Sequence, residues 1–249
     1  MSESRTSRAG LLDDLYSNVL ESIFNMKRAD VRARFGSVMG QILAALEPLS
    51  MGALVVLRST IDPGNIDVLG SVRSIVQCMG SLLSGVTGDD HSVPIQPLHT
   101  SFRDFLTDPS RGGDFYVDES QPHSQLALAS LRVLNRDLPF NICQLETSHL
   151  RNADVPGLVE RVSNAISPPL PYSCRFWATH LNETQFDAII LMEIEDFLRE
   201  KILFWFEAFS LIDALPSAWQ TLAYPIRWVN LKPEAKTWED EVLRDAQNL

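Results

Sequence analysis

One stretch of the chain decides its fold: PIQPLHTSFRDFL, residues 94–106. Two prolines favour an extended first half, because the residue before a proline is disfavoured in the helical region. The second half has the i, i+3, i+4 spacing of one apolar helix face, formed by Phe102, Phe105 and Leu106. We expect Thr100 or Ser101 to cap this helix and Asp104 to lie in its first turn. His99 is therefore predicted to lie at a helix N-terminus, where it can present a polar ring to a phosphate.

Upstream of this stretch, the hydrophobic residues keep a helical period. The segments predicted as helices are 11–24, 31–46, 51–57 and 68–79, with Asp30 capping the second and Ser50 the third. The pattern then changes to two short segments of strand character, 81–86 and 91–97, around the polar turn Gly88-Asp89-Asp90. A helix-turn-helix, 42–57 joined to 68–79, followed by a β-hairpin predicts a winged-helix domain.

The whole chain is predicted to be mainly α. We place the winged-helix domain at 11–112 and an α-helical domain at 113–249, with the boundary at Arg111-Gly112-Gly113. Residues 1–10 are polar and are predicted as a flexible N-terminal tail. The helices expected beyond the boundary are 121–134, 159–166, 172–181 and 186–212, the last as one long helix or two abutting ones. A short apolar element is expected at 141–145.

The charge of the chain argues against a nucleic-acid partner. The 249 residues carry a formal net charge of −11, and residues 183–249 hold 13 Asp and Glu against 6 Lys and Arg. A protein that binds nucleic acid displaces counterions with a basic face, whereas the basic residues at 27–34 are interleaved with acids. The apolar run at 202–206 is far too short to span a bilayer, and no signal-peptide pattern is present. We expect a cytoplasmic protein with no membrane partner.

The cysteines give little support for catalysis or metal binding. Cys78, Cys143 and Cys174 form no C-x-x-C pair, and each lies among apolar residues, so we expect buried free thiols. Cys143, His149 and Asp154 have the residue types of a nucleophilic triad, but no nucleophile elbow surrounds the cysteine. A metal on Cys143 and His149 would lack its third and fourth ligands. We therefore predict no catalytic and no metal-ligating residue.

The remaining histidines and the aromatic residues have simple structural interpretations. His180 is expected in the core or an interface, while His91, His123 and His149 are expected in solvated loops. A set of aromatic residues near the C-terminal end is predicted to be core: Trp205, Phe206, Phe209, Trp219 and Trp228.

The sequence resembles the winged-helix segment and the following helical region of the STAND NTPases, in particular the NACHT proteins of mushroom-forming fungi. The resemblance is carried by the stretch at 94–106 and by further motifs in the same order over about 11–212. These motifs are Leu15-Tyr16, Ile23-Phe24, Pro48-Leu49-Ser50, VRSIV at 72–76, FYVD at 115–118, LAL at 126–128, NIC at 141–143, Ile166-Ser167, YSCRFWATHL at 172–181 and FWFEAFSL at 204–211. Residues 213–249 match poorly.

The resemblance implies a part of a larger switch. In such proteins a NACHT nucleotide-binding core comes first, then the winged helix, a helical region and commonly WD40 repeats. This sequence has no G-x-x-x-x-G-K-[ST] loop, so ATP hydrolysis is not expected, and ATP or ADP with Mg²⁺ would be bound only if a NACHT core were supplied. By resemblance, His99 would contact the ADP phosphate and help hold the closed state, a role that needs the missing core. The implied partner is a NACHT core or another protein, and oligomers are possible in an intact protein.

We therefore expect a non-catalytic regulatory or interaction module that couples nucleotide state to conformational switching in an intact protein, either a shortened relative of the family or a part of one. Two alternatives stay open. The first is a DNA-binding winged-helix protein whose recognition helix is 51–57 or 68–79, although the former has one basic residue, Arg58, at its end. The second is a hydrolase that uses Cys143.

Overall fold

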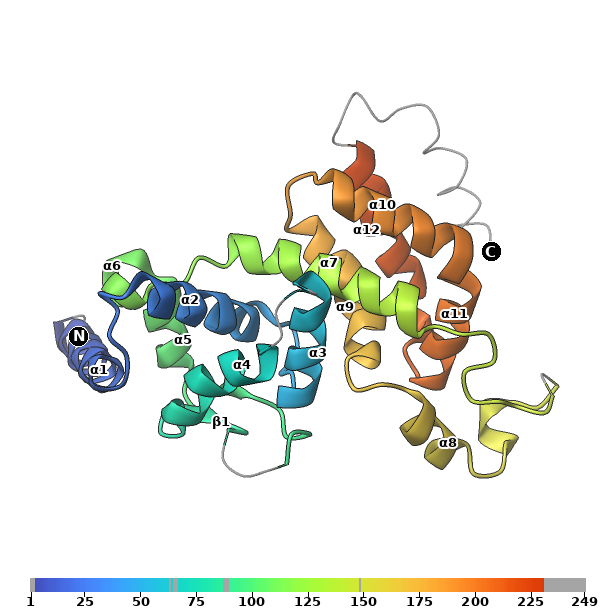
Figure 1. Ribbon diagram of the computed structural model, residues 1–249, viewed down its shortest axis with the longest axis horizontal. Helices are drawn as coiled ribbons and strands as arrows, with labels where there is room; N and C mark the ends of the chain where they lie inside the picture. The colour runs from blue at the N-terminus through green and yellow to red at the C-terminus, as the bar shows by residue number, and fades with distance from the viewer. Residues whose placement is uncertain (1–2, 63, 65–66, 87–89, 148, 231–249) are drawn as a thin grey trace. The chain divides into compact units, whose positions relative to one another are not determined.

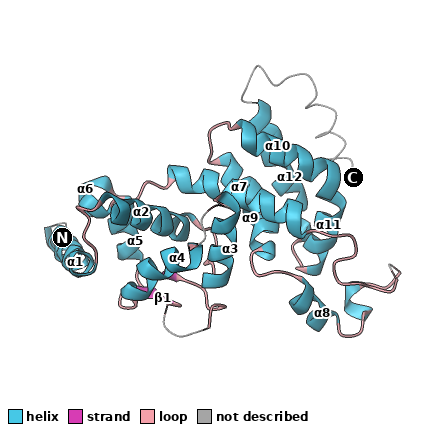
Figure 2. Cartoon of the chain, in the orientation of Figure 1, coloured by secondary structure: helices cyan, strands magenta, loops and turns pink. Residues whose placement is uncertain are grey.

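The chain is mainly helical in its computed structural model (Figure 1), and the sheet in its described part is a two-stranded hairpin (Figure 2). The structure describes residues 3–62, 64, 67–86, 90–147 and 149–230, with side chains from residue 10 onward. The chain divides into two compact units. The first comprises residues 1–55 and 64–122, and the second comprises residues 56–63 and 123–249.

The first unit contains most of the predicted winged-helix region. Its elements are α1 (Glu3–Ile23), α2 (Ala29–Ala44), the first half of α3 (Met51–Ile61), α4 (Val68–Val76), a 3₁₀ turn (Gln77–Met79), β1 (Leu83–Ser84), β2 (Gln96–Pro97), α5 (Thr100–Thr107), α6 (Pro109–Gly112) and a second 3₁₀ turn (Gly113–Phe115). The predicted helices are therefore present. The helix expected from residue 11 begins at Glu3 instead, because the polar residues before it include no proline that would stop the helix. Residues 3–10 of the predicted tail are thus helical.

The helix starts follow the capping rules in part. Ser50 caps α3 as predicted, since its Oγ accepts a hydrogen bond from the Ala53 amide at 3.2 Å. Asp30 does not cap α2, which already begins at Ala29. Its carboxylate lies in the first turn of α2 and pairs with Arg28 at 2.9 Å.

The predicted hairpin forms, but each strand has two residues. β1 and β2 are antiparallel, with Leu83 opposite Pro97 and Ser84 opposite Gln96. The strands predicted at 81–86 and 91–97 are shortened because proline has no amide to donate to the ladder, and because Gly85 turns the chain with φ +74°. Most of the predicted turn lies outside the described residues.

The core of the first unit explains where the unit ends. Phe35 lies between Phe24 and Phe115, with ring centroids 5.3 and 5.7 Å away. The amide of Val117 donates to the Leu106 carbonyl at 2.7 Å. Residues 113–122 therefore group with the first unit, beyond the boundary expected after Gly112.

The second unit is a set of helices. It contains the second half of α3, α7 (Ser120–Asp137) from His123 onward, a 3₁₀ turn (Asn152–Asp154), α8 (Leu158–Ala165), α9 (Leu170–Asn182), α10 (Ala188–Asp196), a π-helical segment (Phe197–Lys201), α11 (Ile202–Leu211), a 3₁₀ turn (Leu215–Ser217) and α12 (Ala218–Asn230). The segment 186–212, predicted as one long helix or two abutting ones, is α10 and α11 joined by a π-helical segment. The element predicted at 141–145 is a turn, in which Asn141 and Gln144 have positive φ.

The prediction that the aromatic residues near the C-terminal end lie in the core is confirmed for Trp205, Phe209 and Trp228. Trp205 is fully buried, stacks on Phe209 at 4.4 Å between centroids, and donates its Nε1–H to the Cys174 carbonyl at 3.2 Å. Trp228 is also buried. The prediction is wrong for Trp219, which is 68% exposed because it lies beside the inward stripe of α12. That stripe consists of Ala218, Leu222, Pro225 and Val229.

Residues 56–63 join the second unit through a polar network. Arg132 on α7 donates to the Thr60 carbonyl at 2.6 Å and to Glu193 on α10 at 2.8 Å. Asn135 donates to the same glutamate at 2.9 Å. The end of α3 is therefore tied to α7 and, through Glu193, to α10. A search of the described helices for a long apolar span found none that could cross a membrane.

Candidate functional site

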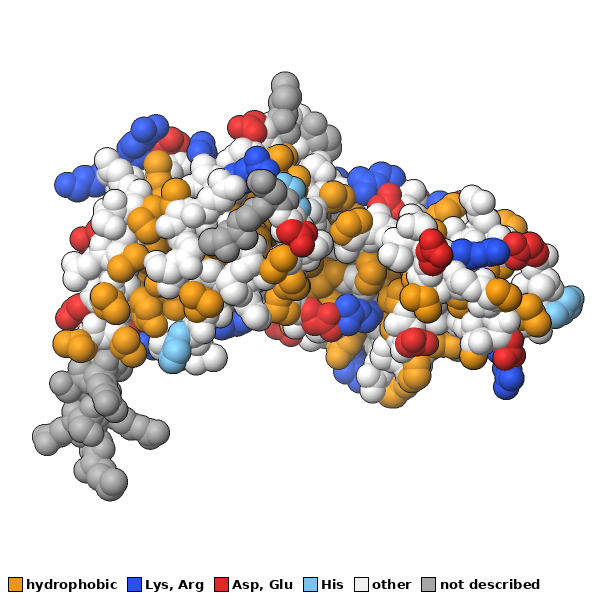
Figure 3. Space-filling model, turned by 90° about the horizontal axis from the view of Figure 1, so that it is seen from below, with side chains coloured by type: hydrophobic (Ala, Val, Ile, Leu, Met, Phe, Trp, Pro, Cys, Tyr) orange, Lys and Arg blue, Asp and Glu red, His pale blue; other side chains and the backbone are white. Residues whose placement is uncertain are grey.

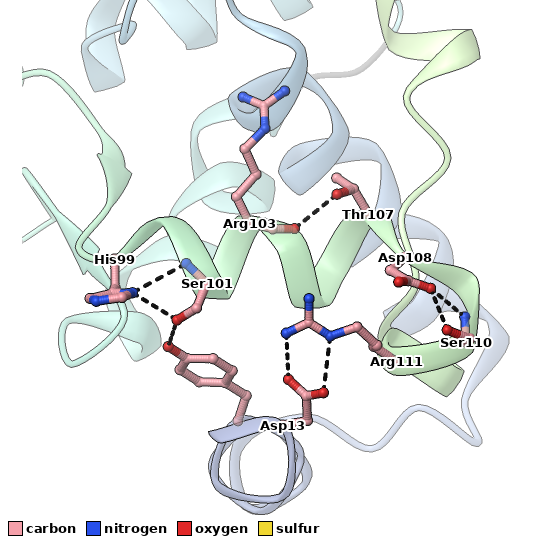
Figure 4. Close-up of polar contacts among 9 residues, drawn as sticks. Asp13, His99, Ser101, Arg103, Thr107, Asp108, Ser110 and Arg111 are labelled. Atoms are coloured by element: carbon pink, nitrogen blue, oxygen red, sulfur yellow. Dashed lines mark hydrogen bonds and ion pairs between the residues drawn. The ribbon is translucent and has the colours of Figure 1, made fainter. Parts of the chain in front are cut away.

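His99 is itself the N-cap of α5 (Figure 4). Its backbone is extended, with φ −140° and ψ 139°, and its Nδ1 accepts a hydrogen bond from the Ser101 amide at 3.2 Å. The prediction that Thr100 or Ser101 would cap the helix is wrong, because both residues already lie within it. Asp104 accordingly falls beyond the first turn. The predicted burial of Phe102, Phe105 and Leu106 is confirmed.

A short polar chain connects this cap to α1. The Ser101 hydroxyl lies 2.7 Å from His99 Nδ1 and 2.6 Å from the Tyr16 hydroxyl. The Tyr16 ring also packs on Phe102 and Phe105, with centroids 5.2 and 5.6 Å apart. The start of α5 is therefore fixed by a hydrogen-bonded chain on one side and aromatic contacts on the other.

The hydrogen bonds determine what the imidazole can offer. Because Nδ1 accepts from the Ser101 amide, the proton of a neutral ring lies on Nε2. The His99 side chain is exposed, and no contact found among the described residues engages Nε2. His99 can therefore donate one hydrogen bond outward, to a phosphate or carboxylate oxygen, from a fixed position.

The charged residues around α5 are already paired. Arg111 makes a bidentate contact with Asp13 of α1 at 2.8 and 3.0 Å, which raises the pKa of Arg111 through this hydrogen bond. Arg103 pairs with Glu119 at 2.8 Å. Asp108 caps α6 through the Ser110 amide at 2.8 Å. A phosphate at His99 would therefore need further cationic or backbone donors from another protein or domain.

The cap predicts a measurable stability effect. His99→Ala removes the acceptor for the Ser101 amide and should lower the free energy of unfolding of the first unit by about 1 kcal/mol. His99→Asn should restore most of the loss, because its amide oxygen can accept the same bond. The measurement is urea unfolding followed by circular dichroism, with His149→Ala as the exposed control. Equal stability of wild type and His99→Ala would contradict the cap.

The three residues with the types of a nucleophilic triad are not brought together by contacts in the described part of the chain. Cys143 is buried, and burial raises the pKa of its thiol, as does the nearby Glu207. Asp154 pairs with Arg151 at 2.8 Å, and His149 is exposed. No hydrogen bond found among the described residues joins Cys143, His149 and Asp154. The thiol thus lacks a base that could activate it.

The other two cysteines differ in exposure. Burial strongly raises the pKa of Cys174, as expected for an inert thiol. Cys78 is exposed, so the prediction that all three thiols are buried is wrong for this residue, which lies on the outer side of the 3₁₀ turn after α4. No group of three or more His, Cys, Asp or Glu that could hold a metal ion is found among the described residues.

The sequence interpretation missed one cluster. His123 is half-buried on α7, not in a solvated loop, and its Nδ1 lies 2.8 Å from Nδ1 of His180 on α9. The Nε2 of His180 lies 2.6 Å from the Tyr172 hydroxyl. Burial, and then His123, lowers the pKa of His180 to about 3. The helix predicted from residue 121 already contained His123, and its spacing to Leu126 and Ser130 could have placed it on an inward face.

Comparison of the chain with protein-family models, curated proteins and solved structures found no match.

Proposed function

We propose that this chain is a non-catalytic regulatory or interaction module, in which a winged helix and a following helical region couple the nucleotide state of a NACHT-type core to a conformational change. The order α3, α4, hairpin and α5 supports the winged-helix part of the proposal. The absence of a phosphate-binding loop from the sequence and the raised pKa of Cys143 support a role without catalysis.

The observation that carries the proposal is the fixed orientation of His99. Its Nδ1 is held by Ser101, so the exposed Nε2–H is the group presented outward at the start of α5. This matches the single hydrogen bond to an ADP phosphate that the family resemblance implies. The nucleotide and Mg²⁺ would be held mainly by the partner core, since the arginines near α5 are paired with acids.

Exposed apolar side chains beside His99 support docking of a protein. Leu98, the preceding residue, is 57% exposed, and Leu15, next to Tyr16 on α1, is 55% exposed. The Tyr16–Ser101 contact brings these two segments together. Hydrophobic side chains also gather at the α1 end of the face shown in Figure 3. A partner that covers them would bury apolar area around the histidine.

DNA recognition receives less support from the candidate recognition helices. Burial lowers the pKa of Arg58 at the end of α3, so this guanidinium is partly withdrawn from solvent. Arg73 on α4 lies 2.7 Å from His91 Nε2. Neither helix therefore presents a basic surface of the kind that displaces phosphate counterions.

Nucleotide binding in trans tests the proposal. The chain is added to the isolated P-loop core of a fungal NACHT protein, and ADP–Mg²⁺ affinity is measured by calorimetry. We expect the chain to tighten ADP binding, and His99→Ala to remove about tenfold of that gain, because a hydrogen bond to a charged group contributes roughly 1.5 kcal/mol or more. His149→Ala is the matched control. Unchanged ADP affinity on addition of the chain, or equal effects of wild type and His99→Ala, would overturn the proposal.

A further inference from the structure

α7 and α9 run antiparallel and are joined by polar contacts at both ends. At one end, Ser167, just before α9, donates to Asp137 at the end of α7 at 3.0 Å. At the other end, His123 near the start of α7 lies 2.8 Å from His180 near the end of α9. The two contacts fix the register of the helices, because they pair an early residue of each helix with a late residue of the other.

Each of these two helices also carries one buried serine. Ser130 and Ser173 each lie two turns from their histidine, or about 10.5 Å along the helix. Both serines are fully buried, and neither Oγ has a hydrogen-bond partner among the described residues. The Nε1–H of Trp177, one turn from Ser173, is also buried and has no hydrogen-bond partner among the described residues. Unpaired buried polar atoms cost free energy, so these three groups make the packing around α7 and α9 less stable than apolar side chains would.

The histidine pair can hold a limited number of protons. The contact between the two Nδ1 atoms needs one proton, which either ring can carry. In both neutral tautomers of His180, its Nε2 can also form a hydrogen bond with the Tyr172 hydroxyl, as acceptor in one and as donor in the other. If both rings are protonated, two N–H groups point at each other across 2.8 Å, and the contact is lost. His123 of α7 is the titratable group that acts on the pKa of His180, whereas α11 and α12, which pack on α9, contribute no charge that shifts it.

We propose that His123, His180 and Tyr172 form an acid-sensitive latch, which holds α9 against α7 while the histidines are neutral and releases it when they are protonated. The unpaired hydroxyls of Ser130 and Ser173 favour opening of the packing around them, since each would then gain a water partner.

The direction of the pH effect follows from the burial of His180. In the closed latch the pKa of His180 is lowered to about 3, whereas an exposed histidine titrates near 6.5. Between these values the open form binds a proton that the closed form does not. Opening is therefore favoured by up to about tenfold per pH unit below 6.5 for one proton. Because half of the open form is already protonated at pH 6.5, the change between pH 6.5 and pH 5 is roughly 15-fold.

Hydrogen exchange of the full chain at several pH values tests the latch. After correction for intrinsic exchange rates, the amides of α9 should lose about 15-fold in protection between pH 6.5 and pH 5. The His180→Gln variant keeps a polar side chain that does not titrate, so its α9 protection should change far less. His149→Gln, which alters an exposed histidine outside the cluster, should behave as wild type.

If His180→Gln does not fold, the latch can still be tested by comparing two helices within the wild-type protein. α8 contains no histidine and serves as an internal reference. Loss of α9 protection with unchanged α8 protection supports the latch. Constant α9 protection, or an equal loss in both helices, overturns it.

Discussion

Trp205→Ala should lower the free energy of unfolding of the second unit by about 3–5 kcal/mol, the range for removing a fully buried large aromatic side chain. The indole stacks on Phe209 at 4.4 Å and meets Phe197 edge-on at 6.1 Å between centroids. Its Nε1–H also satisfies the Cys174 carbonyl, which would be left without this donor. The cavity and the lost hydrogen bond act together, because the variant removes atoms from three contacts at once.

Urea unfolding monitored by far-ultraviolet circular dichroism measures the loss as a lower midpoint for the second unit at an unchanged m-value. Trp219→Ala is the matched control, since this tryptophan is 68% exposed and its removal should change the free energy of unfolding by less than about 0.5 kcal/mol. Similar losses for Trp205→Ala and Trp219→Ala would show that burial at these two positions does not differ as described.

Helix positions could be predicted because each apolar face is encoded locally. Phe102, Phe105 and Leu106 fix α5 by spacing alone, and all three are buried. The helical character of residues 3–10 could not be found in this way, because those residues have no apolar period to detect. The strands were predicted too long, because the alternation of side chains does not show which backbone amides can pair. The hydrogen-bonded ladder is limited by Pro94 and Pro97, which have no amide hydrogen to donate.

The chemistry of the sites was less accessible to sequence reasoning. His99 could be placed at a helix start, but its own role as the cap could not, because capping preferences favour Ser and Thr and the imidazole Nδ1 acts here in their place. The His123–His180 contact joins residues 57 positions apart. Local periodicity can place each histidine on a helix face but contains no information on which faces meet.

Phe35→Ala should destabilise the first unit by about 3–5 kcal/mol. The ring is 1% exposed and is held between Phe24 and Phe115, so its loss leaves a cavity lined by two aromatic rings that cannot both move to fill it. The midpoint of urea unfolding of the first unit measures the effect. Phe140→Ala is the control, because Phe140 is 78% exposed and its removal should change the midpoint little.

The same variant tests where the first unit ends. If residues 113–122 belong with the core around Phe35, the Val117 amide, which donates to the Leu106 carbonyl, should exchange faster in Phe35→Ala than in wild type. Amides of α9, in the second unit, should keep their protection. Unchanged exchange at Val117 would instead mean that Phe115 and its neighbours are held independently of Phe35. The first unit would then end at Gly112, as the sequence Arg111-Gly112-Gly113 predicted.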